Sequence, residues 1–180
     1  RGHNPVASYM AFYEGIDPEV AAPFNFEGLV MGWRASNWRR FLRSFHLSLD
    51  QHSQACIASY AFGNHDQKRL ASRLGEPAAR SVALMELTLP GMAFIYYGEE
   101  IGMAGAKPDE YLREPMVWYA DPAGGEGQTS WEASKYNAAG SAVSVESEQR
   151  DAQSLLAWYR MLLKWRSEEP GDILALIALG

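Results

Sequence analysis

Four polar side chains follow an apolar segment in the first half of the sequence. Asn64, His65 and Asp66 come directly after the run CIASYAFG, residues 56–63, and Arg69 stands about one helical turn further on. An amide, an imidazole, a carboxylate and a guanidinium in one short stretch can bind hydroxyl groups, transfer protons or hold a metal ion. This group is therefore the first candidate site, and its position depends on the elements around it.

The apolar runs around this group predict two parallel strands. Residues 56–63 and 92–97 are apolar without alternation, as in strands that are covered on both faces. Residues 77–89 between them have helical periodicity, with Pro77 in the first turn. Strand, helix and strand in this order predict a βαβ unit with a right-handed crossover. Ligands bind at the carboxyl ends of such strands, which is where residues 64–66 stand.

Three further elements are predicted outside this unit. Residues 21–30 contain a short aromatic alternation between Pro and Gly, which indicates a strand. Residues 36–49 carry an apolar stripe opposite several arginines, which predicts an amphipathic helix. Residues 151–166 predict a last helix that begins with an acidic residue and ends with basic ones, and that buries four large side chains, Leu155, Trp158, Leu162 and Trp165.

A long segment, residues 103–150, is rich in Gly, Pro and Ser. A connection of this length inside a compact protein is usually functional or disordered. Four large aromatic residues favour an ordered loop, and we expect at least two of them to pack within it: Trp118, Tyr119, Trp131 and Tyr136.

The composition excludes several classes of function. The chain has 180 residues, a net charge of -6, 47% hydrophobic and 21% charged residues, which is ordinary for a globular protein. No Lys/Arg cluster exceeds short pieces such as Arg39-Arg40, so we expect no nucleic-acid partner. No apolar run approaches the roughly 18 residues that span a bilayer, so we expect no membrane partner. The one cysteine, Cys56, forms no disulfide framework and is predicted to be buried.

Other interpretations of the polar group remain open at this level. Asp66 could cap the next helix while His65 makes one buried hydrogen bond. A metal site is not predicted, because the other histidines form no HxH or HxxxH pair with His65: His3, His46 and His52. A flavodoxin-like nucleotide site would need a GxGxxG motif or a P-loop after a strand, and the sequence has neither.

Several longer blocks resemble a known family. FGNHDQKR, followed by LTLPGMAFIYYGEEIGM, resembles the C-terminal half of the catalytic barrel in the α-amylase clan of glycoside hydrolases. LREPMVWY, GQTSWE and KYN are similar to the loop after the last barrel strand of bacterial α-amylases and α-glucosidases, and SLLAWYRMLLKWR is similar to the final barrel helix. FNFE is similar to the sixth strand. The resemblance covers nearly the whole chain in the same order.

This resemblance implies an α/β fold and a division of the chain. Residues 1–170 would form part of a (β/α)8 TIM barrel, roughly strands six to eight with their helices. Residues 171–180 would begin the β-sandwich domain that follows the barrel. The chain opens on RGHNP without a methionine and closes on the apolar run DILALIALG, so we interpret it as an excerpt of a longer protein.

The implied activity is retaining hydrolysis of α-glucosidic bonds in starch or maltooligosaccharides. Asp66 matches the third carboxylate of the clan, which binds sugar hydroxyls at the cleavage site rather than attacking the sugar. His65 matches the histidine that shares this task, and Asn64 is the neighbouring substrate-binding residue. Arg69 falls where many members hold an arginine near the same sugar, with an ion pair on the barrel rim as the alternative. Lys68 replaces the proline common in the α-glucosidase branch and disfavours that branch.

The resemblance also implies what this chain lacks. The nucleophilic aspartate and the acid/base glutamate of the clan belong to barrel strands four and five, which precede Arg1, so the chain alone should be inactive. Glu99 and Glu100 are not expected to replace them, because neighbouring side chains of an extended segment point to opposite faces. No cofactor is implied by these residues, since calcium occurs in parts of the clan but on ligands outside them.

Three alternatives stay open within the clan. The protein could be a transglycosylase or a sugar isomerase, because the covalent intermediate can pass to a sugar hydroxyl. It could also be a non-catalytic barrel that serves as a binding or scaffold subunit, although the intact group at residues 64–66 disfavours this. The expected partner is an α-glucan or an oligosaccharide. Linkage, oligomeric state and compartment are open, and the similarity to bacterial amylases favours an extracellular or periplasmic location.

Overall fold

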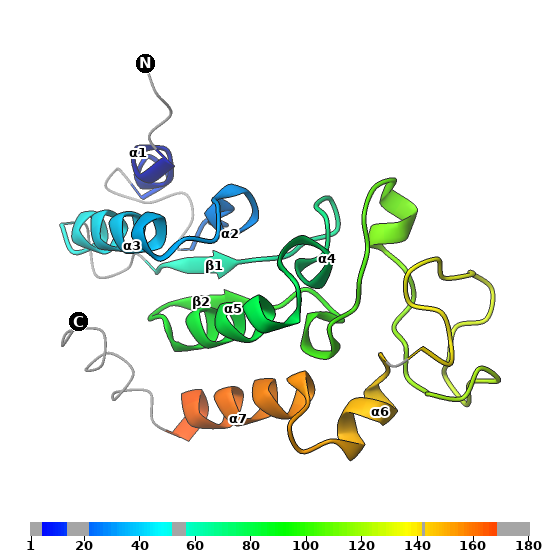
Figure 1. Ribbon diagram of the computed structural model, residues 1–180. Helices are drawn as coiled ribbons and strands as arrows, with labels where there is room; N and C mark the ends of the chain where they lie inside the picture. The colour runs from blue at the N-terminus through cyan, green and yellow to red at the C-terminus, as the bar shows by residue number, and fades with distance from the viewer. Residues whose placement is uncertain (1–4, 14–21, 52–56, 142, 169–180) are drawn as a thin grey trace. The chain divides into compact units, whose positions relative to one another are not determined.

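The computed structural model describes residues 5–13, 22–51, 57–141 and 143–168 (Figure 1). The chain forms two compact units, which are Arg1–Phe62 with Pro90–Phe94, and Gly63–Leu89 with Ile95–Gly180. Across the described residues, no helix is long and apolar enough to cross a membrane. Cys56, His3, His52 and the expected β-sandwich segment, residues 171–180, lie outside the described residues.

The first unit contains the two strands of the described chain. β1, Ser59–Ala61, and β2, Met92–Phe94, pair in parallel, with Tyr60 opposite Ala93. The predicted parallel pair is confirmed, although both strands are shorter than the apolar runs that predict them. β1 is buried throughout, as expected. The expectation for β2 is wrong, since Met92 is 42% exposed and β2 pairs with β1 alone among the described residues.

Three helices accompany the strands in this unit: α1, Pro5–Met10, α2, Glu27–Val30, and α3, Ala35–Leu49. α3 confirms the predicted amphipathic helix. Its buried face consists of Trp38, Phe41 and Phe45. The rings of Phe41 and Phe45 stack at 5.4 Å, and Trp38 lies 5.2 Å from the ring of Phe62, just after β1. The apolar periodicity of α3 therefore forms the aromatic core of this unit.

The strand predicted over residues 21–30 is wrong. The described part of this segment turns into α2 instead. The backbone N–H of Asn25 donates to the hydroxyl of Ser59 at 3.0 Å, and the side-chain oxygen of Asn25 accepts from the N–H of Glu27 at 3.1 Å. Because side chains bind these polar groups, the segment does not need a neighbouring strand, and Asn25 directs the chain into a short helix.

The second unit is mainly helical. α5 confirms the predicted helix of residues 77–89 to within one residue at each end. It packs against the last helix, α7 (Figure 1), where the indole N–H of Trp158 donates to the carbonyl of Arg80 at 3.0 Å. The helices of this unit are α4, Leu70–Leu74, α5, Glu76–Thr88, the 3-10 turns η1, Glu99–Ile101, and η2, Asp109–Leu112, then α6, Val145–Arg150, and α7, Leu155–Glu168.

α7 does not begin with the acidic residue that the sequence predicts. The carboxylate of Asp151 accepts from the N–H of Gln153 at 2.8 Å and so forms a local turn. The hydroxyl of Ser154 accepts from the N–H of Ala157 at 3.1 Å and takes the capping role. The basic last turn is confirmed by Arg166. Leu155 and Leu162 are buried as expected, Trp158 and Trp165 only in part, and the further buried residues are Leu156 and Tyr159.

The long segment of residues 103–150 is ordered around one buried carboxylate. Glu114 is 1% exposed and accepts from the N–H groups of Lys135 at 2.7 Å, Tyr136 at 2.9 Å and Asn137 at 3.0 Å. The side chain of Asn137 donates to the carbonyl of Ala104 at 2.7 Å. These bonds join the start of the segment to a region more than twenty residues later, so the chain between them is a closed loop.

The four aromatic residues of this loop differ in their surroundings. Tyr119 packs within the loop, and its hydroxyl donates to the carbonyl of Glu126 at 2.9 Å. Tyr136 packs edge-on against Tyr111 at 6.0 Å. Trp118 is 46% exposed and Trp131 is 83% exposed. Two aromatic residues therefore make the packing contacts that the sequence predicts, and both indoles are open to solvent.

A glycine in α2 provides a test of the packing in the first unit. A Cβ at Gly28 would lie 2.4 Å from the carbonyl oxygen of Ala61 in β1, whereas a Cβ at Gly32 would have no neighbour nearer than 3.8 Å. We predict that Gly28→Ala lowers the free energy of unfolding of the complete protein by about 1–3 kcal/mol, because the backbone of β1 cannot move aside cheaply. The matched control Gly32→Ala should change it by less than about 1 kcal/mol in urea denaturation. Equal effects of the two substitutions would contradict this packing.

Candidate active site

The candidate site begins where the chain leaves β1. Gly63 is buried, and a Cβ at this position would lie 1.7 Å from Oε1 of Glu99. Only glycine fits this approach between the backbone and a buried carboxylate. Directly after Gly63 the chain becomes exposed, so residues 64–66 emerge at the surface from a tightly packed point.

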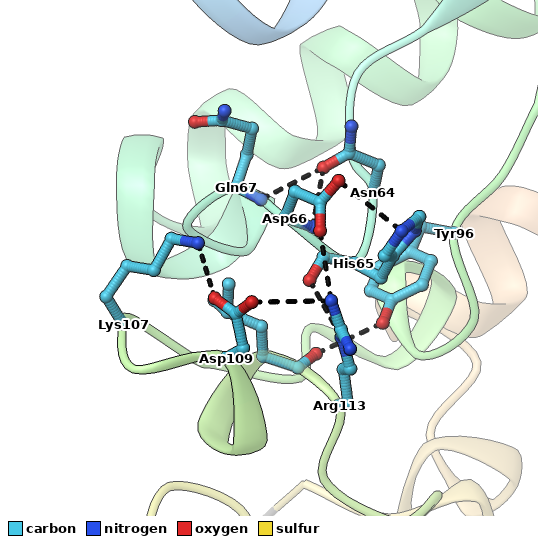
Figure 2. Close-up of polar contacts among 9 residues, drawn as sticks. Asn64, His65, Asp66, Gln67, Tyr96, Lys107, Asp109 and Arg113 are labelled. Atoms are coloured by element: carbon cyan, nitrogen blue, oxygen red, sulfur yellow. Dashed lines mark hydrogen bonds and ion pairs between the residues drawn. The ribbon is translucent and has the colours of Figure 1, made fainter.

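Asn64 shapes the turn that presents the next two side chains (Figure 2). Its Oδ1 accepts from the backbone N–H of Asp66 at 3.0 Å and from that of Gln67 at 2.9 Å. The side chains of His65 and Asp66 are 59% and 52% exposed. Asp66 does not cap α4, because that helix begins after Arg69 without a side-chain cap. The structural alternative of a capping Asp66 and a buried His65 is therefore wrong.

Arg113 joins this turn from a distant part of the sequence. Its Nη2 lies 3.0 Å from Oδ1 of Asp66, and its Nε donates to the carbonyl of His65 at 3.2 Å. The ring Nε2 of His65 lies 3.4 Å from Oδ2 of Asp66. Each oxygen of the Asp66 carboxylate thus faces a different donor, as Figure 2 shows. Sequence reasoning missed Arg113, although it stands within the block LREPMVWY.

A second carboxylate lies on the same guanidinium. Oδ2 of Asp109 is 3.4 Å from Nη2 of Arg113, and its Oδ1 pairs with the ammonium of Lys107 (Figure 2). The hydrogen bond from Lys107 lowers the pKa of the Asp109 carboxyl below its usual value. A general acid needs a raised pKa, so Asp109 is unsuited to protonate a leaving group.

Arg69 is placed differently from the other predicted residues. Its side chain is 1% exposed. Nε donates to the carbonyl of Leu112 at 3.0 Å, and Nη1 donates to that of Tyr97 at 2.6 Å. The guanidinium lies 4.7 Å from the ring centre of Tyr96 and 4.6 Å from that of Tyr97. These contacts give Arg69 a structural function, and its proposed contact with a sugar stays a prediction.

Tyr96 and Arg69 bind the same carbonyl group. The hydroxyl of Tyr96 donates to the carbonyl of Leu112 at 3.2 Å, and this carbonyl also accepts from Nε of Arg69. Burial raises the pKa of Tyr96 to about 12. The phenol therefore remains protonated near neutral pH and keeps its donor role.

Glu99 and Glu86 are buried carboxyls in the same unit. The expectation of an extended segment around Glu99 is wrong, because residues 99–101 form η1. Within this turn, the side chain of Glu99 is 3% exposed. Burial raises the pKa of Glu99 to about 8, and burial together with the charge of Glu99 raises the pKa of Glu86 well above its usual value. Among the described residues, neither carboxylate oxygen of Glu86 has a hydrogen-bond partner. Both groups are removed from solvent and are unsuited to contact a substrate.

Hydrogen bonding to a ligand is one chemistry that this arrangement supports. Within the described ranges, no group of three His, Cys, Asp or Glu side chains could hold a metal ion. Asp66 offers two oriented oxygens at an exposed position, and Arg113 and His65 fix its orientation. Such a carboxylate can accept hydrogen bonds from hydroxyl groups of a neutral ligand.

Comparison with known proteins identifies relatives of this chain. A family model described as the alpha amylase catalytic domain matches residues 4–175. The chain is 44% identical over 105 residues to Alpha-amylase 3 of Dictyoglomus thermophilum, a match that covers 57% of this chain and 21% of that protein. It is 38% identical over 112 residues to the 4-alpha-glucanotransferase of Thermotoga maritima, which covers 58% of this chain and 25% of the relative.

A solved structure agrees with these matches. The crystal structure of the alpha-amylase from H. orenii superposes with a TM-score of 0.78 and 33% identity, over 93% of this chain and 35% of that one. The α/β fold predicted from the sequence is therefore supported by this neighbour. The chain spans only 21% and 25% of the two curated relatives.

The burial of Arg69 predicts a large effect on stability. Arg69→Lys keeps the charge but cannot reach two carbonyl groups with a planar fork, so we expect the free energy of unfolding to fall by about 2–4 kcal/mol. Lys68→Ala, at the exposed neighbouring position, should change it by less than about 0.5 kcal/mol. Urea denaturation of the complete protein measures both. A stability of Arg69→Lys equal to that of Lys68→Ala would contradict the structural function.

The buried carboxyls predict how stability depends on pH. Because burial raises the pKa values of Glu86 and Glu99 above the ordinary carboxyl value of 4.5, the folded protein keeps protons that the unfolded chain releases. The contribution of these two groups to stability is therefore largest in acid and falls as the pH rises from about 4.5 to about 8. We expect Glu86→Gln to reduce this slope by up to about 1.4 kcal/mol per pH unit, and Glu76→Gln, exposed on the same helix, to leave it unchanged. Urea denaturation at a series of pH values from 5 to 8 measures this dependence. The same slope of unfolding free energy against pH for Glu86→Gln and for the parent protein would contradict the prediction.

Proposed function

Because the chain belongs to the α-amylase catalytic-domain family, whose model matches residues 4–175, we propose that it is part of a retaining glycoside hydrolase. The substrate class is α-glucosidic bonds in starch or maltooligosaccharides. Cleavage in such enzymes proceeds through a covalent glycosyl-enzyme intermediate and an oxocarbenium-like transition state. The similarity to Alpha-amylase 3 of Dictyoglomus thermophilum supports this substrate class.

We place the chain in the C-terminal part of a (β/α)8 barrel. β1 and β2 would be its seventh and eighth strands, and the segment of residues 21–30 would stand in the sixth position. The parallel pairing of β1 and β2, with α4 and α5 between them in sequence, supports this assignment. The assignment predicts that residues 171–180 lead into a β-sandwich domain.

The observation that carries the proposal is the position of Asp66. It follows the carboxyl end of β1, where ligands of parallel α/β proteins bind, and it is exposed with both oxygens oriented. In the proposed reaction Asp66 accepts hydrogen bonds from hydroxyls of the sugar at the cleavage site. These bonds strengthen as positive charge develops on the ring, so they lower the barrier rather than only binding the substrate. His65 donates to the same sugar, and Asn64 holds the turn.

The nucleophile and the acid/base residue come from outside this chain. A retaining glycosidase needs two carboxyl groups about 5–5.5 Å apart, one of them with a raised pKa. Asp109 has a lowered pKa and Glu99 is buried, so neither supplies the missing pair. We propose that segments before Arg1 provide both, and that the chain alone is inactive.

A second candidate is transfer of the glycosyl group to another sugar. The 38% identity to the 4-alpha-glucanotransferase of Thermotoga maritima favours it. The glycosyl-enzyme intermediate is the same, and the acceptor is a sugar hydroxyl instead of water. The contacts of Asp66 serve both reactions, so the distinction rests on the products. A scaffold without activity is disfavoured by the intact group of residues 64–66.

A substitution of Asp66 tests the proposal in the complete protein. We expect Asp66→Asn to lower kcat/KM on maltoheptaose by about 10²- to 10⁴-fold, because hydrogen bonds that form in the transition state are weakened. Asp109→Asn, which removes the other carboxylate on Arg113, should lower it by less than about threefold. Product analysis separates short hydrolysis products from elongated transfer products. Full activity of Asp66→Asn would sink the assignment.

A further inference from the structure

A pocket lies between the long loop and α6. Its lining residues differ from those of the candidate active site. It has a volume of about 520 Å³ and is lined by Trp118, Tyr119, Glu126 and, from α6, Val145, Glu146 and Gln149. It shares no lining residue with the group around Asp66. This volume is within the range of pockets that bind small ligands.

Hydrogen bonds from backbone N–H groups hold the walls of this pocket. The N–H of Glu146 donates to the carbonyl of Trp118 at 3.0 Å, and Oε2 of Glu146 accepts from the N–H of Ala120 at 2.9 Å. The N–H of Trp118 donates to Oε1 of Gln128 at 2.9 Å. The loop is therefore fixed to the start of α6 on both sides of the indole, and the pocket exists before a ligand binds.

The lining combines an aromatic face with hydrogen-bonding groups. Trp118 is 46% exposed, so part of its indole is available to a ligand. Glu126 and Gln149 are exposed and offer acceptors and an amide donor. Glu146 pairs with Arg150, which compensates its charge. Among the residues that the structure describes, no cationic side chain lines the pocket, so it is a poor site for a phosphate or another anion.

A sugar ring fits this combination. One face of a pyranose is formed by C–H groups that pack on an aromatic ring, and its hydroxyls at the edge both donate and accept hydrogen bonds. We propose that this pocket is a non-catalytic binding site for a glucose unit of an α-glucan, with the ring on Trp118 and the hydroxyls on Glu126 and Gln149. The choice of an α-glucan rests on the proposed function. Such a site holds a polymeric substrate on the protein and raises its effective concentration at the catalytic site.

Affinity electrophoresis in gels that contain amylopectin tests this site. The complete protein is used as the Asp66→Asn variant, so that the polymer is not digested. We expect Trp118→Ala in this background to raise the dissociation constant for amylopectin about tenfold, and Gln149→Ala to raise it about threefold. Trp131→Ala removes an indole that is 83% exposed and does not line the pocket, and it should leave the constant within about twofold.

The outcomes separate this site from the proposed activity. Retention of Trp118→Ala and Gln149→Ala equal to that of Trp131→Ala would overturn the site, whatever the rate of hydrolysis. If the parent protein fails to cleave or transfer maltoheptaose but its retention still depends on Trp118, the proposed activity fails and the site stands. Circular dichroism checks that the variants are folded. If Trp118→Ala does not fold, the test rests on Gln149→Ala, which lies at an exposed position of α6. A gel with a soluble β-glucan should show no dependence on Trp118.

Discussion

A single buried cation holds the second unit together. The guanidinium of Arg69 packs against the rings of both Tyr96 and Tyr97 and donates to carbonyls of Tyr97 and Leu112, while the backbone N–H of Arg69 donates to the carbonyl of Gly105. Tyr97, Gly105 and Leu112 therefore meet at one residue that lies 28 to 43 positions earlier in the sequence. Among the described residues Nη2 has no hydrogen-bond partner, so the two carbonyl bonds and the two ring contacts are what compensate the buried charge, and they restrict the motion of the segments that make them. The turn at Asp66 starts from this fixed base.

The candidate site depends on two further constraints, one local and one long-range. Gly63 and Asn64 shape the turn that carries Asp66, because the first permits the approach to Glu99 and the second binds the N–H groups of the turn. Arg113 then orients the Asp66 carboxylate from 47 residues further along the chain. An exposed carboxylate would otherwise sample several rotamers, and each would lose part of the benefit of preorganisation.

The sequence predicted those features that depend on local periodicity. α3 and α5 were readable because their apolar residues recur along one face, and the parallel pairing of β1 and β2 followed from the intervening helix. The start of α7 and the fold of residues 21–30 were not readable, since they depend on side chains that bind the backbone. The types of the polar residues 64–66 are enough to predict a candidate site. Arg113 is not predictable in this way, because nothing in its spacing along the chain relates it to Asp66. Residue patterns report neighbours along an element, whereas a site is assembled across elements.

The Glu114 anchor has a consequence for how such a protein can diversify. Because Glu114 binds the backbone of residues 135–137, the ends of the intervening loop stay together whatever the loop contains. Lengthening a closed loop adds only about 0.6 kcal/mol for each doubling of its length. The exposed residues 130–133 of this loop can therefore gain, lose or exchange residues while the helices around the loop keep their fold. One buried acid thus allows the tip of the loop to vary in length without separating its ends.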